Sequence, residues 1–240
     1  MAIEINGLSK AFGGHQVLRS LDFSLPSSKR TALLGASGCG KSVLFHLLAG
    51  LLSLDSGRMQ VDGELVDKLP VSYMQQKDLL LPWYTLLENA SLPLVLSGVR
   101  KQEAHAQVQS HLARFGLADF TDHYPNQLSG GMRQRVALLR TMIYRQPIVL
   151  MDEPFSAIDA LSAQQLRLFL KELQEKEQFT LFFITHNVEE ALDLADEIWV
   201  MHKESTPQLQ RIDSTGLDYE ARRKLLWQAL GVGQGVLSMH

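Results

Sequence analysis

The sequence is poor in cysteine and nearly balanced in charge, and each of these features disfavours a class of protein. Cys39 is the only cysteine, so no internal disulfide can form, which favours a reducing compartment such as the cytosol. The formal net charge is −3, from 23 basic and 26 acidic residues. Nucleic-acid-binding domains normally carry a clustered basic surface. We therefore expect no nucleic-acid partner.

Long hydrophobic runs are also absent. The longest apolar stretch, Val43–Leu54, is interrupted by His46 and Ser53, and it is shorter than the about 20 residues that a membrane-spanning helix needs. The segment Met1–Lys10 lacks the basic and then apolar pattern of a secretory signal. These absences predict a soluble chain, whose role at any membrane would depend on a partner.

Short apolar runs indicate an α/β protein. Alternating apolar and polar residues in Ile3–Ile5 and Val17–Leu25 are typical of half-buried antiparallel strands. Four continuous apolar runs, separated by helical patterns, are typical of a parallel sheet that is buried on both faces. These runs are Thr31–Leu34, Val71–Met74, Ile148–Met151 and Thr180–Ile184.

Helical spacing dominates the middle and the end of the chain. Residues from about Thr85 to Leu128 show no strand-like run and predict a helical insertion into the α/β core. A further helix is expected over Met132–Tyr144, because Pro147 blocks its continuation. Beyond residue 202 the pattern weakens, except for an amphipathic helix over Glu220–Leu230.

A phosphate-binding loop follows the run that ends at Leu34. Residues 35–42 match the Walker A pattern G-x-x-x-x-G-K-[ST] and lead into a helical run, which is the context that this motif requires. Glycines let the backbone N–H groups turn inward, and the helix N-terminus adds positive potential. In this motif Lys41 reaches the β- and γ-phosphates, and Ser42 binds Mg²⁺. The nucleotide-binding residues expected here are Gly35, Ala36, Ser37, Gly38, Cys39, Gly40, Lys41, Ser42 and Val43.

Polar side chains end three further strands of the expected sheet. Asp152 and Glu153 follow one strand in a Walker B pattern, Gln75 and Gln76 follow another, and His186 follows a third. Ligands of open α/β sheets bind outside the carboxyl ends of the strands. We expect Asp152 to hold Mg²⁺ and Glu153 to polarise the attacking water. Taken alone, the acid pair also fits a helix N-cap, and a single histidine is more often structural.

A second anion-binding turn is expected at Ser129, Gly130 and Gly131, at the start of the helix over Met132–Tyr144. The surrounding run Gln127–Arg135 resembles the LSGGQ signature of ABC ATPases, with Met132 in the fifth place. The resemblance extends over about Ile3–His202. It implies a P-loop NTPase (RecA-like) core with a mainly parallel sheet, an antiparallel β subdomain and an inserted helical subdomain.

The family resemblance also implies the assembly and the remaining site residues. Two subunits would pack head to tail as a homodimer, with each ATP held between the Walker A loop of one and the signature of the other. Phe12 would stack on adenine, although a lone phenylalanine is more often core. Gln76, preferred over Gln75, would sense Mg²⁺, Asp159 of the segment Ser156–Asp159 would reach across the dimer, and His186 would contact the γ-phosphate. Catalytic roles thus fall to Glu153, His186 and Gln76, and metal ligation to Ser42, Gln76 and Asp152.

The same resemblance implies a partner in a membrane. The segment Tyr73–Trp83 and the signature run are similar to those of importer ATPases for nitrate, taurine, aliphatic sulfonates and thiamine-precursor pyrimidines. A separate permease, served by a solute-binding protein, would hold the chain at the cytoplasmic face of the membrane. Trp83 and Tyr84 would either dock the permease or pack inside the helical segment. A non-transport ABC ATPase and a P-loop kinase or GTPase are the rival interpretations.

The sequence predicts a single domain over residues 1–240 with three parts. These are a core at about 1–84 and 145–202, a helical subdomain at about 85–144, and a tail at 203–240.

Overall fold

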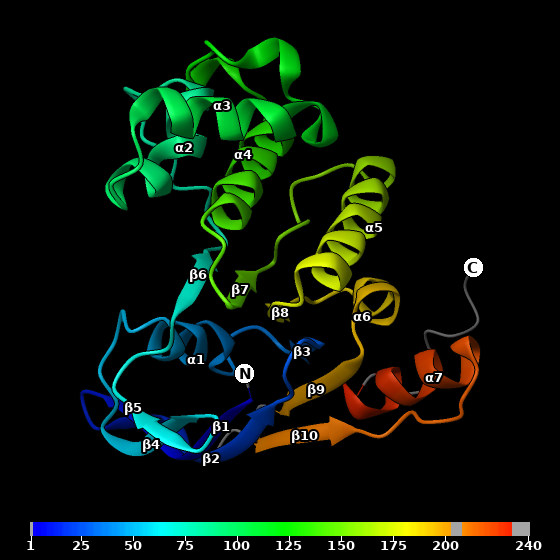
Figure 1. Cartoon of the computed structure of the whole chain (residues 1–240). Coiled ribbons are helices and arrows are strands. Elements are labelled where there is room, and N and C mark those ends of the chain that lie inside the picture. The colour runs from blue at the N-terminus through cyan, green and yellow to red at the C-terminus, as the bar shows by residue number, and fades with distance from the viewer. Residues whose placement is uncertain (1, 203–207, 232–240) are drawn as a thin grey trace. The chain divides into compact units, whose positions relative to one another are not determined.

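The computed structural model describes residues 2–202 and 208–231, which form two compact units (Figure 1). The first unit combines the residues up to Leu69 with those from Gln178 onward. The second unit runs from Pro70 to Glu177.

An antiparallel sheet of four strands, in the order β2-β1-β4-β5, opens the first unit. Its strands are β1 Ile3–Phe12, β2 His15–Leu25, β4 Ser56–Val61 and β5 Glu64–Val66. The turn between β4 and β5 consists of Asp62 and Gly63, both with positive φ (50° and 85°). This is the backbone that a two-residue type I′ hairpin requires. The sheet is the expected antiparallel β subdomain.

Two parallel strands of the first unit, β3 Arg30–Gly35 and β8 Thr180–Ile184, lead into the phosphate loop and into the turn that holds His186. Strand β3 is buried throughout and lies between β8 and β9 Glu197–His202, parallel to both. Strand β10 Gln208–Ile212 extends the order antiparallel to β9. The helices of this unit are α1 Lys41–Leu48, α6 Val188–Leu194 and α7 Tyr219–Ala229, and α6 packs against β3 and α7.

Two parallel strands and four long helices build the second unit. Strands β6 Val71–Met74 and β7 Ile148–Asp152 pair in parallel, and β7 is fully buried. The helices are α2 Leu86–Leu96, α3 Lys101–Leu112, α4 Gly130–Ile143 and α5 Ala160–Glu177. Helix α4 packs against β6, α2 and α3. Short 3-10 turns at 113–115, 118–120 and 125–127 connect α3 to α4.

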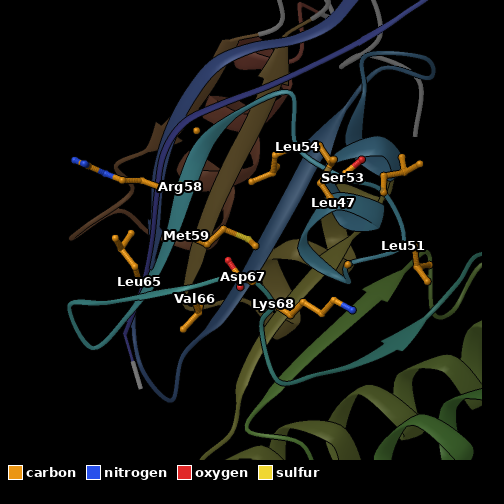
Figure 2. A pocket seen from close by; sticks show the side chains of 13 residues that line it. Leu47, Leu51, Ser53, Leu54, Arg58, Met59, Leu65, Val66, Asp67 and Lys68 are labelled. Atoms are coloured by element: carbon orange, nitrogen blue, oxygen red, sulfur yellow. The ribbon is translucent and has the colours of Figure 1, made fainter.

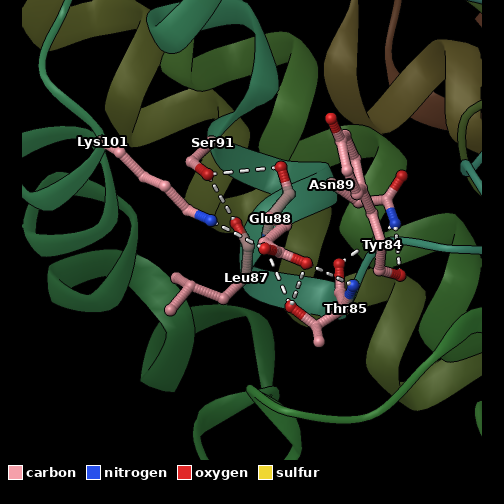
Figure 3. A network of polar contacts seen from close by, with 7 residues as sticks. All are labelled: Tyr84, Thr85, Leu87, Glu88, Asn89, Ser91 and Lys101. Atoms are coloured by element: carbon pink, nitrogen blue, oxygen red, sulfur yellow. Dashed lines mark hydrogen bonds and ion pairs between the residues drawn. The ribbon is translucent and has the colours of Figure 1, made fainter.

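A network of polar contacts fixes the start of α2 (Figure 3). Thr85 is the N-cap, and its hydroxyl accepts the Glu88 N–H while the Glu88 carboxylate accepts the Thr85 N–H. Lys101 of α3 binds the other Glu88 oxygen at 2.8 Å. The fully buried Asn89 amide donates to the carbonyls of Leu81, Tyr84 and Thr85 (3.1, 3.0 and 3.0 Å). The loop before α2 is therefore held from inside the unit.

Most expected elements are confirmed, with differences at their ends. The four apolar runs are strands in parallel pairs, and the stretch from Thr85 to Leu128 holds helices and 3-10 turns without a strand. Helix α4 begins at Gly130, two residues earlier than expected, because Ser129 is its N-cap. Strand β10 was not predicted, because the sequence pattern beyond residue 202 is weak. Helix α7 confirms the helix that was predicted near the end of the chain.

None of the helices within the described ranges is both long and apolar enough to span a bilayer.

Candidate functional site

The phosphate loop requires glycine at two of its positions. Gly35 has a φ of +152°, and a Cβ there would lie 2.4 Å from the carbonyl oxygen of Met201. Gly40 has a φ of +105°, and a Cβ would lie 2.8 Å from a methyl carbon of Leu18. Since L-residues rarely adopt this backbone and no space exists for a side chain, only glycine fits. The loop is thus anchored between β9 and β2 of its own unit.

The lysine of the loop lies across the loop's own backbone. Lys41 Nζ donates to the carbonyl oxygens of Gly35 and Ala36, at 2.7 and 2.9 Å. Cys39 is only 2 % exposed, so it is a packing residue under the loop. The exposed rim consists of Ala36, Ser37, Gly38 and Ser42. An ammonium and exposed backbone at the N-terminus of α1 form a suitable place for an anion.

His186 lies at the carboxyl end of the neighbouring strand. Strands β3 and β8 pair directly, and the Thr185 N–H donates to the Leu33 carbonyl at 3.2 Å. The Thr185 hydroxyl donates to the buried Glu190 carboxylate at 2.6 Å, and the Asn187 side chain caps α6. The exposed His186 therefore sits on a rigid turn. The structure brings it to the same sheet edge as the phosphate loop, as expected.

Phe12 is a surface residue of this unit. It ends strand β1, is 45 % exposed, and lies 5.5 Å from the Lys10 ammonium. The following strand, β2, contacts Gly40 through Val17 and Leu18. The core alternative for Phe12 is therefore excluded, and an aromatic face is available on the hairpin that supports the phosphate loop.

In the second unit, the acid pair and the glutamine meet at the ends of β6 and β7. Gln76 Nε2 donates to Glu153 Oε2 at 3.1 Å. Asp152 is 4 % exposed. The pKa of Tyr73 is raised, mainly because Tyr73 itself is buried and to a smaller extent because of the Asp152 charge. Because the next helix after Glu153 begins only at Ala160, the helix N-cap alternative for the acid pair is wrong. The contact with Glu153 also favours Gln76 over Gln75.

The signature turn is the N-terminus of helix α4. Ser129 Oγ accepts the Met132 N–H at 3.2 Å, and both Ser129 and Gly130 are exposed. Gly131 packs closely, since a Cβ there would lie 3.1 Å from the Ala157 carbonyl oxygen. The two glycines form the first helical turn, with their N–H groups at the positive end of the helix.

Asp159 lies next to this helix, at the start of α5. Its carboxylate accepts the Ser162 N–H at 2.9 Å and pairs with Arg135 of α4 at 3.3 Å. Hydrogen bonds from Ser162, with a smaller contribution from the Arg135 charge, hold the pKa of Asp159 below its usual value. The residue is exposed and ionised at neutral pH.

A buried glutamine beside the acid pair was not predicted from the sequence. Gln134 of α4 is 4 % exposed, and its Nε2 donates to the carbonyl oxygens of Glu153 and Pro154. The sequence did contain a signal, because Gln134 is three and four residues before the buried Ala137 and Leu138. A glutamine on the apolar stripe of a helix needs buried hydrogen-bond partners.

A pocket of about 530 Å³ lies in the first unit, at the C-terminal end of α1 (Figure 2). Leu47, Leu51 and Leu54 line one side, and Met59 and Val66 of β4 and β5 lie opposite. Figure 2 shows the Lys68 and Arg58 side chains at its margin. None of the predicted nucleotide-binding residues lines it.

Comparison with known proteins agrees with this arrangement. Residues 18–156 match the ABC transporter family. The chain is 38 % identical over 204 residues to the aliphatic sulfonates import ATP-binding protein SsuB 2 of Agrobacterium fabrum, covering 84 % of this chain and 76 % of that protein. It is 39 % identical over 207 residues to the taurine import ATP-binding protein TauB of Rhizobium johnstonii, covering 85 % and 78 %. With the formylaminopyrimidine import ATP-binding protein ThiZ of Halalkalibacterium halodurans it shares 42 % identity over 184 residues, 77 % and 72 % of the two chains.

A solved structure shows the same architecture. The dimeric structure of a bacterial ABC transporter cassette superimposes with a TM-score of 0.79 at 25 % identity, covering 87 % of this chain and 97 % of that one. Together with the P-loop and signature motifs, these similarities define the class. The chain belongs to the ABC transporter family, and its fold is that of an ABC ATPase with a P-loop NTPase core.

Proposed function

We propose that this chain is the ATP-binding and ATP-hydrolysing subunit of an ABC importer. The observation that carries the proposal is the hydrogen bond between Gln76 and Glu153 at the ends of two parallel strands. This hydrogen bond orients the Glu153 carboxylate at the carboxyl ends of the strands, where α/β proteins bind their ligands. Family membership and the glycine-only phosphate loop support the same conclusion.

The phosphate loop would bind the β- and γ-phosphates. Backbone N–H groups of residues 36–42 and the N-terminus of α1 would cradle the oxygens, and Lys41 would exchange its contacts with the Gly35 and Ala36 carbonyls for phosphate oxygens. Val43 occupies the position where the family commonly has threonine, so only its backbone N–H is available to the α-phosphate. We assign adenine stacking to Phe12.

The residues present suit a magnesium ion. Mg²⁺ prefers oxygen ligands and usually retains several waters and phosphate oxygens. Ser42, Gln76 and Asp152 provide a hydroxyl, an amide and a carboxylate, and Asp152 is buried at a strand end. Within the described residues no three His, Cys, Asp or Glu side chains gather into a metal-binding cluster. When bound, the ion would neutralise charge on the phosphates.

Catalysis would depend on positioning and on charge. Glu153, held by Gln76, would orient a water molecule in line with the γ-phosphate and accept its proton. His186 would donate a hydrogen bond to the γ-phosphate. Lys41 would offset the charge that accumulates as the terminal bond breaks.

Ser129, Gly130 and Gly131 would complete the site of a second copy of the chain. Each ATP would then lie between the phosphate loop of one subunit and the signature turn of the other, with Asp159 reaching across the interface. The dimeric structure of a related cassette supports this assembly. Hydrolysis would require the dimer, so specific activity should rise with protein concentration.

A membrane permease is the proposed partner for transport. The relatives are named as import ATP-binding proteins for aliphatic sulfonates, taurine and formylaminopyrimidine. We propose a solute of these kinds, delivered by a solute-binding protein, and a location at the cytoplasmic face of the membrane. Trp83 is 67 % exposed on a loop held by Asn89, which fits docking and not packing inside the helices. Residues 85–144 would form the subdomain that receives the permease.

Replacing Glu153 by glutamine tests the proposal. Because the general base is lost while the shape is kept, turnover should fall by about 100-fold or more. The dissociation constant for MgATP, measured by equilibrium dialysis, should stay within about twofold. Glu172→Gln, at an exposed position of α5, is the matched control and should keep normal turnover. Normal hydrolysis by the Glu153 variant would remove that residue from the mechanism.

A further inference from the structure

The amide of Gln134 is a buried donor directed at the backbone of the acid pair. Its Nε2 lies 3.0 Å from the Glu153 carbonyl oxygen and 3.2 Å from that of Pro154. Both hydrogens of one amide group are thus used on two consecutive carbonyls. Since Gln134 is 4 % exposed, water cannot readily replace these bonds.

Those two carbonyls belong to a strained piece of backbone. Glu153 has a φ of +50°, which is uncommon for a residue with a side chain. Such a conformation persists only when the surroundings hold it. Pro154 has no N–H, so the residue immediately after Glu153 can be held through its backbone only by its carbonyl oxygen.

Two other groups complete the support of Glu153. The Ser156 N–H and hydroxyl donate to the same Glu153 carbonyl, at 3.3 and 3.1 Å. Gln76 binds the carboxylate at the other end of the residue. The backbone of Glu153 is therefore held from helix α4, while its side chain is held from the end of β6.

Helix α4 contacts this segment at two further points. Gly131 packs against the Ala157 carbonyl, and Arg135 pairs with Asp159. The first two turns of the signature helix thus contact residues 153–159 repeatedly. A displacement of this helix would be transmitted to the Glu153 carbonyl through Gln134, which is the buried contact of the three.

We infer that Gln134 is a positioning residue for Glu153, and that it makes the direction of the catalytic carboxylate depend on the placement of the signature helix. The inference rests on the proposed role of Glu153. Gln134 acts on the reaction through the backbone that it holds. A partner engaging the signature turn would in this way act on the catalytic carboxylate of the same chain.

The test is Gln134→Met, which keeps the length of the side chain and removes both donors. We expect kcat to fall by about 10- to 100-fold, as for a slightly misplaced catalytic group, with the KM and dissociation constant for MgATP within about twofold. Gln174→Met is the matched control, because Gln174 is a buried glutamine on α5. It should lower the melting temperature while leaving kcat within about twofold. Equal kcat losses in both variants, or normal kcat in Gln134→Met, would overturn the inference.

A second variant covers the case in which Gln134→Met does not fold. Ser156→Ala removes a hydroxyl donor from the same carbonyl at an exposed position, so folding should be preserved. Its kcat should fall by about threefold at unchanged KM, a smaller loss because the Ser156 N–H remains; an unchanged kcat would count against the inference. Glu153→Gln is assayed in parallel. If it retains turnover, the proposed role of Glu153 fails; if it is inactive while Gln134→Met and Ser156→Ala are normal, only the positioning inference fails.

Discussion

The phosphate loop and the signature turn both lead into a helix, but they are built differently. Each places backbone N–H groups at the N-terminus of a helix, α1 in one case and α4 in the other. The phosphate loop adds Lys41 and two positions where only glycine fits. The signature turn begins with a capping serine, and its one tight glycine, Gly131, has ordinary helical backbone.

This difference suggests different tasks. A loop with its own ammonium and a backbone folded to enclose an anion is suited to bind phosphate strongly without help. A short exposed turn without a lysine offers a helix dipole and a hydroxyl, which are worth about 1 kcal/mol each. The signature turn is therefore suited to add to a phosphate that is already bound elsewhere.

Replacing Lys41 should have the largest effect, because it removes the ammonium that the phosphate loop has and the signature turn lacks. Lys41→Ala should weaken MgATP binding by about 100-fold, since hydrogen bonds between charged groups are lost. Equilibrium dialysis measures this loss. Lys29→Ala, at an exposed lysine before β3, is the control and should bind normally. Tight binding by Lys41→Ala would show that the two turns do not differ in the way described.

Changing the charge of the signature turn separates its anion-binding role from its capping role. Aspartate caps helices as well as serine does, so Ser129→Asp should fold normally while its carboxylate repels a phosphate. We expect turnover to fall by about 100-fold with unchanged MgATP binding to the isolated subunit. Ser129→Asn, which caps without charge, should lose far less.

Mixing the Ser129→Asp and Lys41→Ala proteins sharpens the comparison further. A heterodimer would contain one intact phosphate loop facing one intact signature turn. The ATPase activity of the mixture should therefore exceed that of either variant alone. Absence of such a gain at every mixing ratio would contradict a site shared between two copies.

The glycines of the two turns should differ in their effect on folding. Gly40→Ala places a Cβ 2.8 Å from Leu18 on backbone with φ +105°, and should lower the free energy of unfolding by about 2 kcal/mol. Gly131→Ala has helical backbone and a longer contact, 3.1 Å from the Cβ to the Ala157 carbonyl oxygen, so alanine's helix propensity offsets part of the strain. Its change should stay within about 1 kcal/mol. Urea denaturation of both variants measures the difference, and equal losses would contradict it.

The smallest effect on MgATP binding is expected from replacing Phe12, which is proposed to stack on adenine. Phe12→Ala should raise the dissociation constant for MgATP by about fivefold, the lower range for loss of an aromatic stacking contact. Phe12→Tyr should retain normal affinity. Binding of inorganic triphosphate, which has no base, should be equal in all three proteins. An equal loss for triphosphate would place Phe12 in the phosphate site and not beside adenine.

The strands that carry the site were predictable because they are short, continuous apolar runs. The missed strands lack that property. Strand β4 contains glycine and charge, and β5 has only three residues. Their turn, Asp62-Gly63, was nevertheless a recognisable hairpin signal. Strand β10 is polar and mostly exposed, and its place depends on pairing with β9, which no local pattern reveals.

The motifs of the site were readable as sequence, but their supporting contacts were not. Lys41, Glu153 and Ser129 belong to short motifs, and the residue types and spacing of these motifs indicate their chemistry. Gln134 acts on a residue 19 positions away, and the positive φ of Glu153 is imposed by that packing and by Ser156. Contacts of this kind arise only when helices and strands are assembled.

Analytical ultracentrifugation of the Glu153→Gln protein with MgATP tests the shared site most directly. ATP that cannot be cleaved should hold two copies together, giving a dimer with ATP and a monomer with ADP. Adding Ser129→Asp to the same protein should return it to a monomer although ATP still binds. A monomer with saturating MgATP, or a dimer that withstands Ser129→Asp, would contradict the account.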